Sequence, residues 1–239
     1  MSRLTAAHLE AHLPPAAQAR LATSRQQSLA EVFPAVARQV GRAKLAPCDS
    51  AVRALSDTAS AGSGEGQPAA GPAGWTVDQA VRALLLVGVE SAEVLELYRY
   101  GDAAEKHAVL RALSVAEVAG RLGDSALPIV ADAIRTNDQR LLAAALGPYA
   151  TEWLPPASFR QAVLKCVFAG VPLAVVDGLP SRADDGLVRM MKDFAAERTA
   201  AGRDVPADLQ PYLRPDLAGD RQPGPPAALS PVSPPRRGV

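Results

Sequence analysis

Start and stop signals for helices recur along residues 75–213 and divide them into segments of about 10 to 20 residues. Thr76 and Gln79 form a T-x-x-Q capping box at the start of one segment, and Asp102 and Glu105 begin another. Glycine follows several of the segments, as is common where a helix ends. This arrangement leaves little room for long strands and predicts a succession of short helices.

Composition also favours helices over strands. Roughly a fifth of the residues are alanine, the best helix former. Aromatic residues, which all-β cores favour, make up only 4% of the chain. The one β-like hexamer, Val171 to Val176, contains Pro172, which a central strand does not accommodate. We therefore expect an all-α protein, an irregular helical array in the form of a HEAT-like α-solenoid or a bundle, without a fixed repeat period.

Two segments differ in composition from the rest. Residues 56–74 are rich in Gly, Ala, Ser and Pro and have almost no large apolar side chain, so we expect a flexible internal loop. Residues 214–239 are rich in proline and end in SPPRRGV, which is typical of a disordered tail. The expected organisation is an N-terminal helical segment, 1–55, that forms one domain with a helical core, 75–213.

Charge and hydropathy argue against nucleic-acid and membrane partners. The 25 basic and 25 acidic residues cancel, so we expect no broad basic surface for nucleic acid or an anionic membrane. The longest apolar run, Ala83 to Val89, is far shorter than the ~20 residues that cross a bilayer. The N-terminus has no apolar stretch of signal-peptide length. We expect a cytoplasmic protein without direct membrane insertion.

The three histidines give weak signals for function. His8 and His12 have an i, i+4 spacing that suits a metal ion, but no third ligand is close in sequence. His107 shares a polar helix face with Arg111, as a solvated residue would. The sequence therefore predicts no metal site.

The sequence also shows no pattern typical of a nucleophile or a cofactor. Cys48 and Cys166 lie far apart, without a CxxC pair or a nearby histidine, so we expect two reduced thiols. The common motifs of nucleotide binding, zinc proteases and serine hydrolases are absent. We expect no cofactor, and the sequence favours a protein without catalytic activity.

The segment from Ser158 to Gly170 is predicted to form a helix that is apolar nearly all round, which is typical of a central helix. Cys166 lies among its core residues and is expected to pack as a small hydrophobe. Lys165 lies on the other side, near Leu164 and Phe168. Its ammonium group either reaches water along the helix surface or faces an acidic partner or a ligand.

The last long helix, Asp184 to Ala201, is predicted to carry Arg198 in the middle of its apolar stripe. A guanidinium there needs acceptors, because an unpaired buried charge is very costly. Arg189, Asp193 and Glu197 follow one another at i, i+4 spacing beside the stripe. Arg198 is therefore expected either in a buried network that fixes the last helices or in the lining of an anion-binding cleft.

Three blocks of the sequence resemble the EboA-domain family over about residues 75–215. FRQAVLKCVFAGVPLAVVDGLPSRADDGLVRMMKDFAAERTAAGR, residues 159–203, is similar to the family's N-Q-M-V-L-K-A-L-F-x-G-x-P-L and G-L-D-x-R-A-N-x-x-L-A-x-M-L-x-D-Y-A-x-E-R-W-A-A-G-R. GWTVDQAVRALLLV resembles the family's W-T-x-D-Q-A-x-R-x-L-L-L helix. RTNDQRLLAAALGPYATEWL resembles its R-T-N segment with the following P-Y.

The match to the family pattern is that of a divergent member. The polar and charged residues that match the pattern around the last long helices are our candidate ligand-binding residues: Gln161, Lys165, Arg182, Asp193, Glu197 and Arg198. Five positions depart from the pattern: Arg160, Ala162, Pro180, Asp184 and Thr199.

The resemblance implies a bacterial helical protein that is encoded with a prenyltransferase-like membrane protein, TIM-barrel proteins and a dehydroquinate-synthase-like protein. This set is associated with secondary-metabolite production and with the movement of metabolites toward the periplasm. The resemblance implies no reaction for the chain itself.

Two functions follow from these observations. The favoured one is a non-catalytic helical scaffold or adaptor in such a metabolite-trafficking pathway, with partners among the proteins of the set. The alternative is a small-metabolite-binding protein or enzyme with an anion-binding cleft near Lys165, Arg182 and Arg198. There the cations would bind the carboxylate or phosphate of a small anionic metabolite, with Glu197 as orienting group or general base.

Overall fold

The computed structural model describes residues 4–45 and 74–213. The loop expected at 56–74, apart from its last residue, and the tail expected at 214–239 lie outside the described residues. The helices of the first range are α1 (Ala6–Ala11), α2 (Pro15–Ser24) and α3 (Leu29–Val40). Those of the second are α5 (Val77–Leu85), α6 (Ser91–Tyr100), α7 (Ala103–Ala112), α8 (Ala116–Leu122), η1 (Gly123–Ala126), α9 (Leu127–Arg135), α10 (Gln139–Ala145), α11 (Pro148–Trp153), α12 (Pro156–Ala169), η2 (Leu173–Val175), α13 (Leu179–Arg182), α14 (Asp185–Ala200), η3 (Ala207–Leu209) and α15 (Gln210–Leu213).

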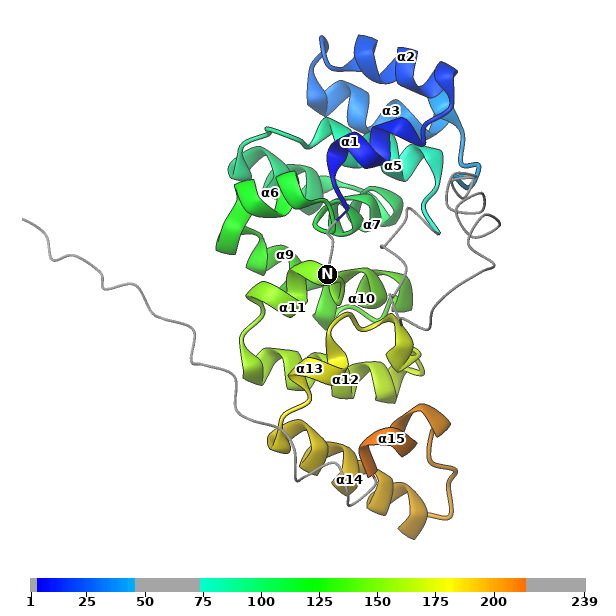
Figure 1. Cartoon of the computed structure of the whole chain (residues 1–239), viewed down its shortest axis with the longest axis vertical. Helices are drawn as coiled ribbons and strands as arrows, with labels where there is room; N and C mark the ends of the chain where they lie inside the picture. The colour runs from blue at the N-terminus through cyan, green and yellow to red at the C-terminus, as the bar shows by residue number, and fades with distance from the viewer. Residues whose placement is uncertain (1–3, 46–73, 214–239) are drawn as a thin grey trace, which may run out of the picture.

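The helices stack into an elongated array (Figure 1). α2 and α3 lie at one end and α14 and α15 at the other, and the helices between follow broadly in chain order. α3 packs on α5, α5 on α7, α7 on α10, α10 on α12 and α12 on α14. In residues 4–45 and 74–213 there is no strand, and β-type pairing is limited to isolated bridges. The all-α array predicted from the sequence is confirmed.

The helices begin where the capping residues indicate. At α5 the Gln79 side chain accepts the Thr76 N–H at 3.2 Å. At α7 the Asp102 and Glu105 side chains accept each other's main-chain N–H groups, at 2.8 and 3.0 Å. These reciprocal bonds satisfy donors that the start of a helix leaves without an intrahelical partner. Both predicted capping boxes are confirmed.

Main-chain pairing joins the N-terminal helices to the later ones. Residues 43–45 run antiparallel to residues 75–77, and the Leu45 N–H donates to the Trp75 carbonyl at 2.8 Å. α1, α2 and α3 all pack against α5. Their buried apolar side chains belong to the same hydrophobic cluster as those of the later helices.

The most enclosed of the long helices is α5 rather than α12. Every residue of α5 except Gln79 is buried. α12 buries one face, which includes Cys166, and leaves Phe168 66% exposed. The expectation that residues 158–170 form the central helix is wrong, because α12 lies toward one end of the array, where neighbours cover only part of its surface.

The β-like hexamer at residues 171–176 forms a tight turn. Gly170 ends α12 in the left-handed conformation, with a φ of 71° that favours glycine. Leu173–Val175 then form the 3₁₀ turn η2. The Asp177 N–H donates to the Leu146 carbonyl at 2.9 Å, so the chain turns back toward α10 immediately after the hexamer.

Candidate functional site

The two predicted ligand-binding residues of α12 differ in their surroundings. Gln161 is exposed. Lys165 is half-buried, and its Nζ donates to the Thr136 carbonyl at 2.7 Å, where α9 ends. A cation stabilises the C-terminal end of a helix, where carbonyl groups are left without N–H partners. The ammonium group of Lys165 therefore braces α12 against α9.

Arg182 bonds to the end of another helix. Its Nη groups donate to the Ala150 and Leu154 carbonyls, both at 2.7 Å, where α11 ends. Its Cζ lies 4.1 Å from the centre of the Phe159 ring on α12. Burial lowers the pKa of Arg182, while the charge of Asp184 acts in the opposite direction. The guanidinium connects α13 to both α11 and α12.

The remaining three predicted residues lie on α14. Arg198 is half-buried, its Nε donates to the Asp204 carbonyl at 2.6 Å, and its Cζ lies 5.8 Å from the centre of the Phe194 ring. Asp193 and Glu197 are exposed. The acceptor that Arg198 needs is thus a main-chain carbonyl in the segment after α14.

The six predicted residues are spread over α12, α13 and α14. Among the described residues, no hydrogen bond or ion pair joins any two of them. Lys165, Arg182 and Arg198 each donate to main-chain carbonyls of a different segment. Their role in ligand binding stays a prediction.

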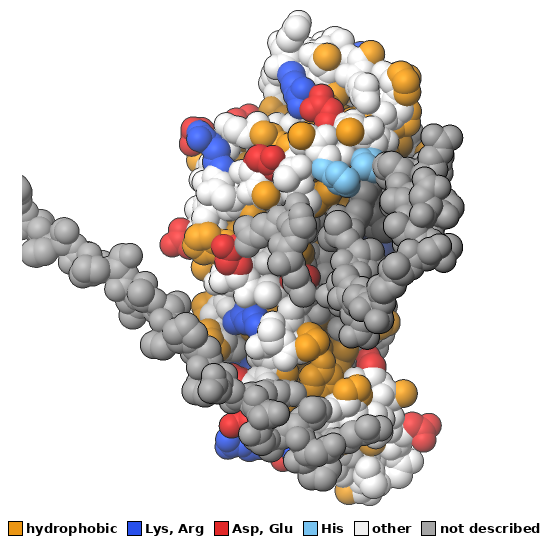
Figure 2. Space-filling view, in the orientation of Figure 1, with side chains coloured by type: hydrophobic (Ala, Val, Ile, Leu, Met, Phe, Trp, Pro, Cys, Tyr) orange, Lys and Arg blue, Asp and Glu red, His pale blue; other side chains and the backbone are white. Residues whose placement is uncertain are grey.

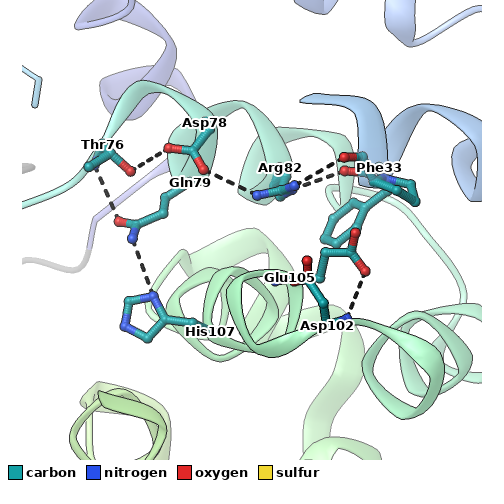
Figure 3. A network of polar contacts seen from close by, with 9 residues as sticks. Phe33, Thr76, Asp78, Gln79, Arg82, Asp102, Glu105 and His107 are labelled. Atoms are coloured by element: carbon teal, nitrogen blue, oxygen red, sulfur yellow. Dashed lines mark hydrogen bonds and ion pairs between the residues drawn. The ribbon is translucent and has the colours of Figure 1, made fainter. Parts of the chain in front are cut away.

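A buried ion pair lies within α5 (Figure 3). Arg82 Nη1 donates to Asp78 Oδ2 at 3.1 Å, and the two side chains are 2% and 6% exposed. Arg82 Nε also donates to the Phe33 carbonyl at 3.0 Å, and Nη2 donates to the Pro34 carbonyl at 3.5 Å. Burial lowers the pKa of Arg82, and the Asp78 carboxylate acts against this. The pair fastens α5 to α3.

This pair was not among the predicted residues, although its spacing gives a signal. Asp78 and Arg82 are four residues apart in a helix that is otherwise almost entirely apolar. On such a helix two opposite charges at this spacing are expected to pair, since burying either alone is costly. The other acceptors lie 49 and 48 residues away from Arg82 and are main-chain carbonyls, which no side-chain pattern reveals.

Arg111 lies beside Trp75, one turn along α7 from His107. The Cζ of Arg111 is 4.5 Å from the centre of the Trp75 ring, and Trp75 is 3% exposed. Arg111 Nε is buried and has no hydrogen-bond partner. Burial lowers the pKa of Arg111. The expectation that His107 and Arg111 form a solvated face is wrong: both are half-buried, because α7 packs against α5 on one side and α10 on another.

His107 connects α7 to the start of α5. Gln79 Oε1 accepts the Thr76 N–H, so the Gln79 Nε2 group donates to His107 Nδ1, at 3.2 Å (Figure 3). With Nδ1 as acceptor, the ring hydrogen of neutral His107 is on Nε2. Burial lowers the pKa of His107, and the charges of Arg111 and Arg140 lower it further. Its surroundings therefore favour the neutral form of His107.

A cleft of about 270 Å³ lies between α3, α6 and the start of α7. Its walls combine apolar groups of Pro34, Leu97 and Tyr100 with the carboxylates of Glu93 and Glu96. The Tyr100 side chain is 77% exposed. The size and mixed lining suit a small molecule with an apolar part.

Of the two cysteines, Cys166 lies within the described residues and Cys48 lies outside them. Cys166 is buried among apolar side chains, as predicted, and burial raises the pKa of its thiol to about 12. In residues 4–45 and 74–213, no three His, Cys, Asp or Glu side chains are grouped so that they would hold a metal ion. Over the same ranges, no helix has the length and apolarity needed to cross a bilayer.

Comparison with known proteins identifies the family. The model of the family described as "Metabolite traffic protein EboA" matches residues 8–213. The match starts well before residue 75, so it includes α2, α3 and part of α1 as well as the helices in which the resemblance was seen. No curated protein and no solved structure was found to match. Because the family model covers most of its length, the chain belongs to the EboA family.

Proposed function

We propose that the chain serves metabolite traffic as a non-catalytic helical adaptor that binds partner proteins of one pathway. The family description supports the role in metabolite traffic. The observation that supports an adaptor is the exposure of Phe168, whose side chain is 66% accessible near the end of α12. Val175, in the turn that follows, is 42% exposed.

The Phe168 ring is held in a defined position on the surface. It meets the Phe194 ring of α14 edge-on, with centroids 4.8 Å apart and an angle of 82° between planes, a favourable arrangement. On the visible face, hydrophobic side chains gather at the level of α12 and α13 (Figure 2). Large exposed aromatic groups are typical of protein interfaces. In this proposal a partner protein covers Phe168.

The bonds of Lys165 and Arg182 support the same function. Each side chain joins α12 or α13 to the end of an earlier helix, so the surface around Phe168 rests on braced helices. A rigid surface loses little conformational entropy when a partner binds. In this proposal both cations hold the surface around Phe168 in place.

The proposed partners are the prenyltransferase-like membrane protein and the TIM-barrel proteins that the family resemblance implies. In this proposal the chain stays in the bacterial cytoplasm and brings the TIM-barrel proteins to the membrane protein during secondary-metabolite production. Aromatic residues at the centre of an interface often contribute most of its binding energy, so one substitution tests the idea.

The test is co-expression of the full chain with each proposed partner, followed by co-purification. Phe168→Ser should abolish capture of at least one partner. Tyr100→Ser is the matched control, because it removes another exposed aromatic group, on α6, and should leave capture unchanged. Thermal melts monitored by circular dichroism verify that both variants fold. Capture of the partners by Phe168→Ser at the level of the unmodified chain would contradict the proposal.

A second candidate function is the binding of a small metabolite, and the cleft beside Tyr100 favours it. Mass spectrometry of small molecules that co-purify from the native host tests this candidate. Tyr100→Ala should lose the bound molecule and Phe168→Ser should retain it, which is the reverse of the pattern expected for the adaptor. Equal recovery from both variants would count against the cleft.

A further inference from the structure

Arg111 differs from the other half-buried or buried arginines that brace the array. Arg82 donates to a carboxylate and to main-chain carbonyls, and Arg182 donates to two carbonyls. Within residues 4–45 and 74–213, Arg111 has no hydrogen bond and no ion pair, and its Nε is shut off from water. A guanidinium carries five N–H donors, and folded proteins normally provide acceptors for the buried ones.

The two carboxylates that act on His107 are already engaged by other groups. Asp78 accepts from Arg82 and, at 2.6 Å, from the Thr76 hydroxyl. Asp138 accepts from Arg140 at 2.9 Å and caps α10. These two acids and two arginines, Arg111 and Arg140, are the charged groups that act on His107. Among the described residues, no carboxylate forms an ion pair with Arg111, and burial is what lowers its pKa.

We propose that Arg111, laid over Trp75 and accompanied by His107, binds the carboxylate or phosphate oxyanion of a small metabolite. The Trp75 ring lies against the guanidinium, whose Nε is buried, so the two Nη groups are left to donate two parallel bonds to an oxyanion. His107 adds a neutral N–H donor one helical turn away. This site goes beyond the adaptor function and lies on α5 and α7, away from the cations of α12, α13 and α14.

The fluorescence of Trp75 reports on this site. The chain has two tryptophans, and Trp153→Phe leaves Trp75 as the only one. Trp153 Nε1 has no hydrogen-bond partner, so this background substitution removes no hydrogen bond. The Trp153→Phe protein should show a saturable fluorescence change on addition of inorganic phosphate or citrate. Sodium chloride at equal ionic strength should not reproduce it.

Two variants in this background assign the response to Arg111. Arg111→Gln should weaken binding at least about tenfold, since a hydrogen bond to a charged group is worth that much. Arg111→Lys keeps the charge but loses the fork and should bind with intermediate affinity. The matched control is Arg99→Gln, because Arg99 also lies over an aromatic ring, Tyr100, but on the exposed side of α6.

Three results would overturn the proposal: no saturable response in the Trp153→Phe protein, the same response to chloride, or an unchanged response in Arg111→Gln. If Arg111→Gln fails to fold, urea denaturation of the unmodified chain tests the site instead. A ligand that binds only the folded state raises the urea midpoint at low concentration until its site is full. The general stabilisation by phosphate and citrate instead grows steadily with salt concentration. A rise in the midpoint that does not level off, or equal midpoints in the three salts, would refute the site.

Discussion

Arg82 has both a carboxylate and main-chain carbonyls as acceptors, and it is almost completely buried. Arg182 and Arg198 are half-buried and donate to main-chain carbonyls alone. The difference matters for stability, because removing one member of a buried ion pair leaves the other charge uncompensated.

Arg82→Met should therefore lower the free energy of unfolding by about 3–5 kcal/mol, since it leaves Asp78 buried without its partner. Arg140→Met, which removes the exposed partner of Asp138, should lower it far less, because solvent screens this pair. The double variant, Arg82→Met with Asp78→Leu, should lose less stability than Arg82→Met alone, because it leaves no unpaired carboxylate buried. Urea denaturation followed by circular dichroism measures all three. If Arg82→Met lowers the free energy of unfolding no more than Arg140→Met does, the Arg82–Asp78 pair does not behave as a buried ion pair.

Cys166 is predicted to be chemically silent in the folded protein. Burial raises the pKa of its thiol to about 12, so at pH 8 only about one thiol in ten thousand is the reactive thiolate. Iodoacetamide should leave the Cys166 peptide unmodified in buffer and alkylate it in concentrated urea, as measured by peptide mass spectrometry. Alkylation at similar rates in both conditions would mean that α12 opens readily.

At the scale of the helices, the side chain of Arg182 joins α13 to α11. The Arg182 guanidinium satisfies two carbonyls at the end of α11 and covers Phe159 of α12. Neither short helix is stable by itself, because helices of this length need tertiary contacts.

Arg182→Gln should lower the free energy of unfolding by about 2–3 kcal/mol, because it removes charge-assisted bonds to two carbonyls. Arg189→Gln on α14 is the control, since Arg189 is exposed, and it should change stability by less than about 0.5 kcal/mol. Urea midpoints provide the measurement. A stable Arg182→Gln protein that has lost the pathway phenotype in the host would instead favour the anion site predicted around Lys165 and Arg182.

The elements that the sequence predicted correctly are those whose signals are local. The capping boxes of α5 and α7 involve residues three positions apart, so their partners are visible in the sequence. The degree of enclosure of α12 was not visible in this way. It depends on where the helix lies in the array, and its own residues are apolar on both sides.

The surroundings of the candidate site residues were harder to predict, because they too depend on distant parts of the chain. Lys165 stood out as a cation near apolar residues and Arg182 as a match to the family pattern, but their acceptors are carbonyls 29 and 32 residues away. A carbonyl belongs to every residue and therefore leaves no mark in a sequence. Arg111 looked like part of a solvated face because the ring that it covers, Trp75, is far from it in the chain.

At the scale of the molecule, each helix packs mainly on helices near it in the array. In such a quasi-one-dimensional structure, a local loss of packing is expected to stay local. This distinguishes the array from a bundle in which all helices share one central axis.

Leu187→Ala in α14 removes a fully buried side chain and should lower stability near that end by about 2–5 kcal/mol. Hydrogen exchange measured by mass spectrometry should then speed up in α14 and α15 while α5 and α7 stay protected. Val81→Ala in α5 is the comparison, because α5 contacts helices on both sides and its variant should affect a wider region. Faster exchange throughout the molecule in Leu187→Ala would show that the array unfolds as one unit.

The antiparallel pairing of residues 43–45 with residues 75–77 has a consequence for how the chain tolerates insertions. It fixes the two ends of the intervening segment side by side, independently of how many residues lie between them. The entropy of closing a loop grows only with the logarithm of its length, so a doubling costs about 0.6 kcal/mol. The helices on either side of this pairing can therefore keep their packing while the intervening segment is lengthened, shortened or replaced by a reporter domain.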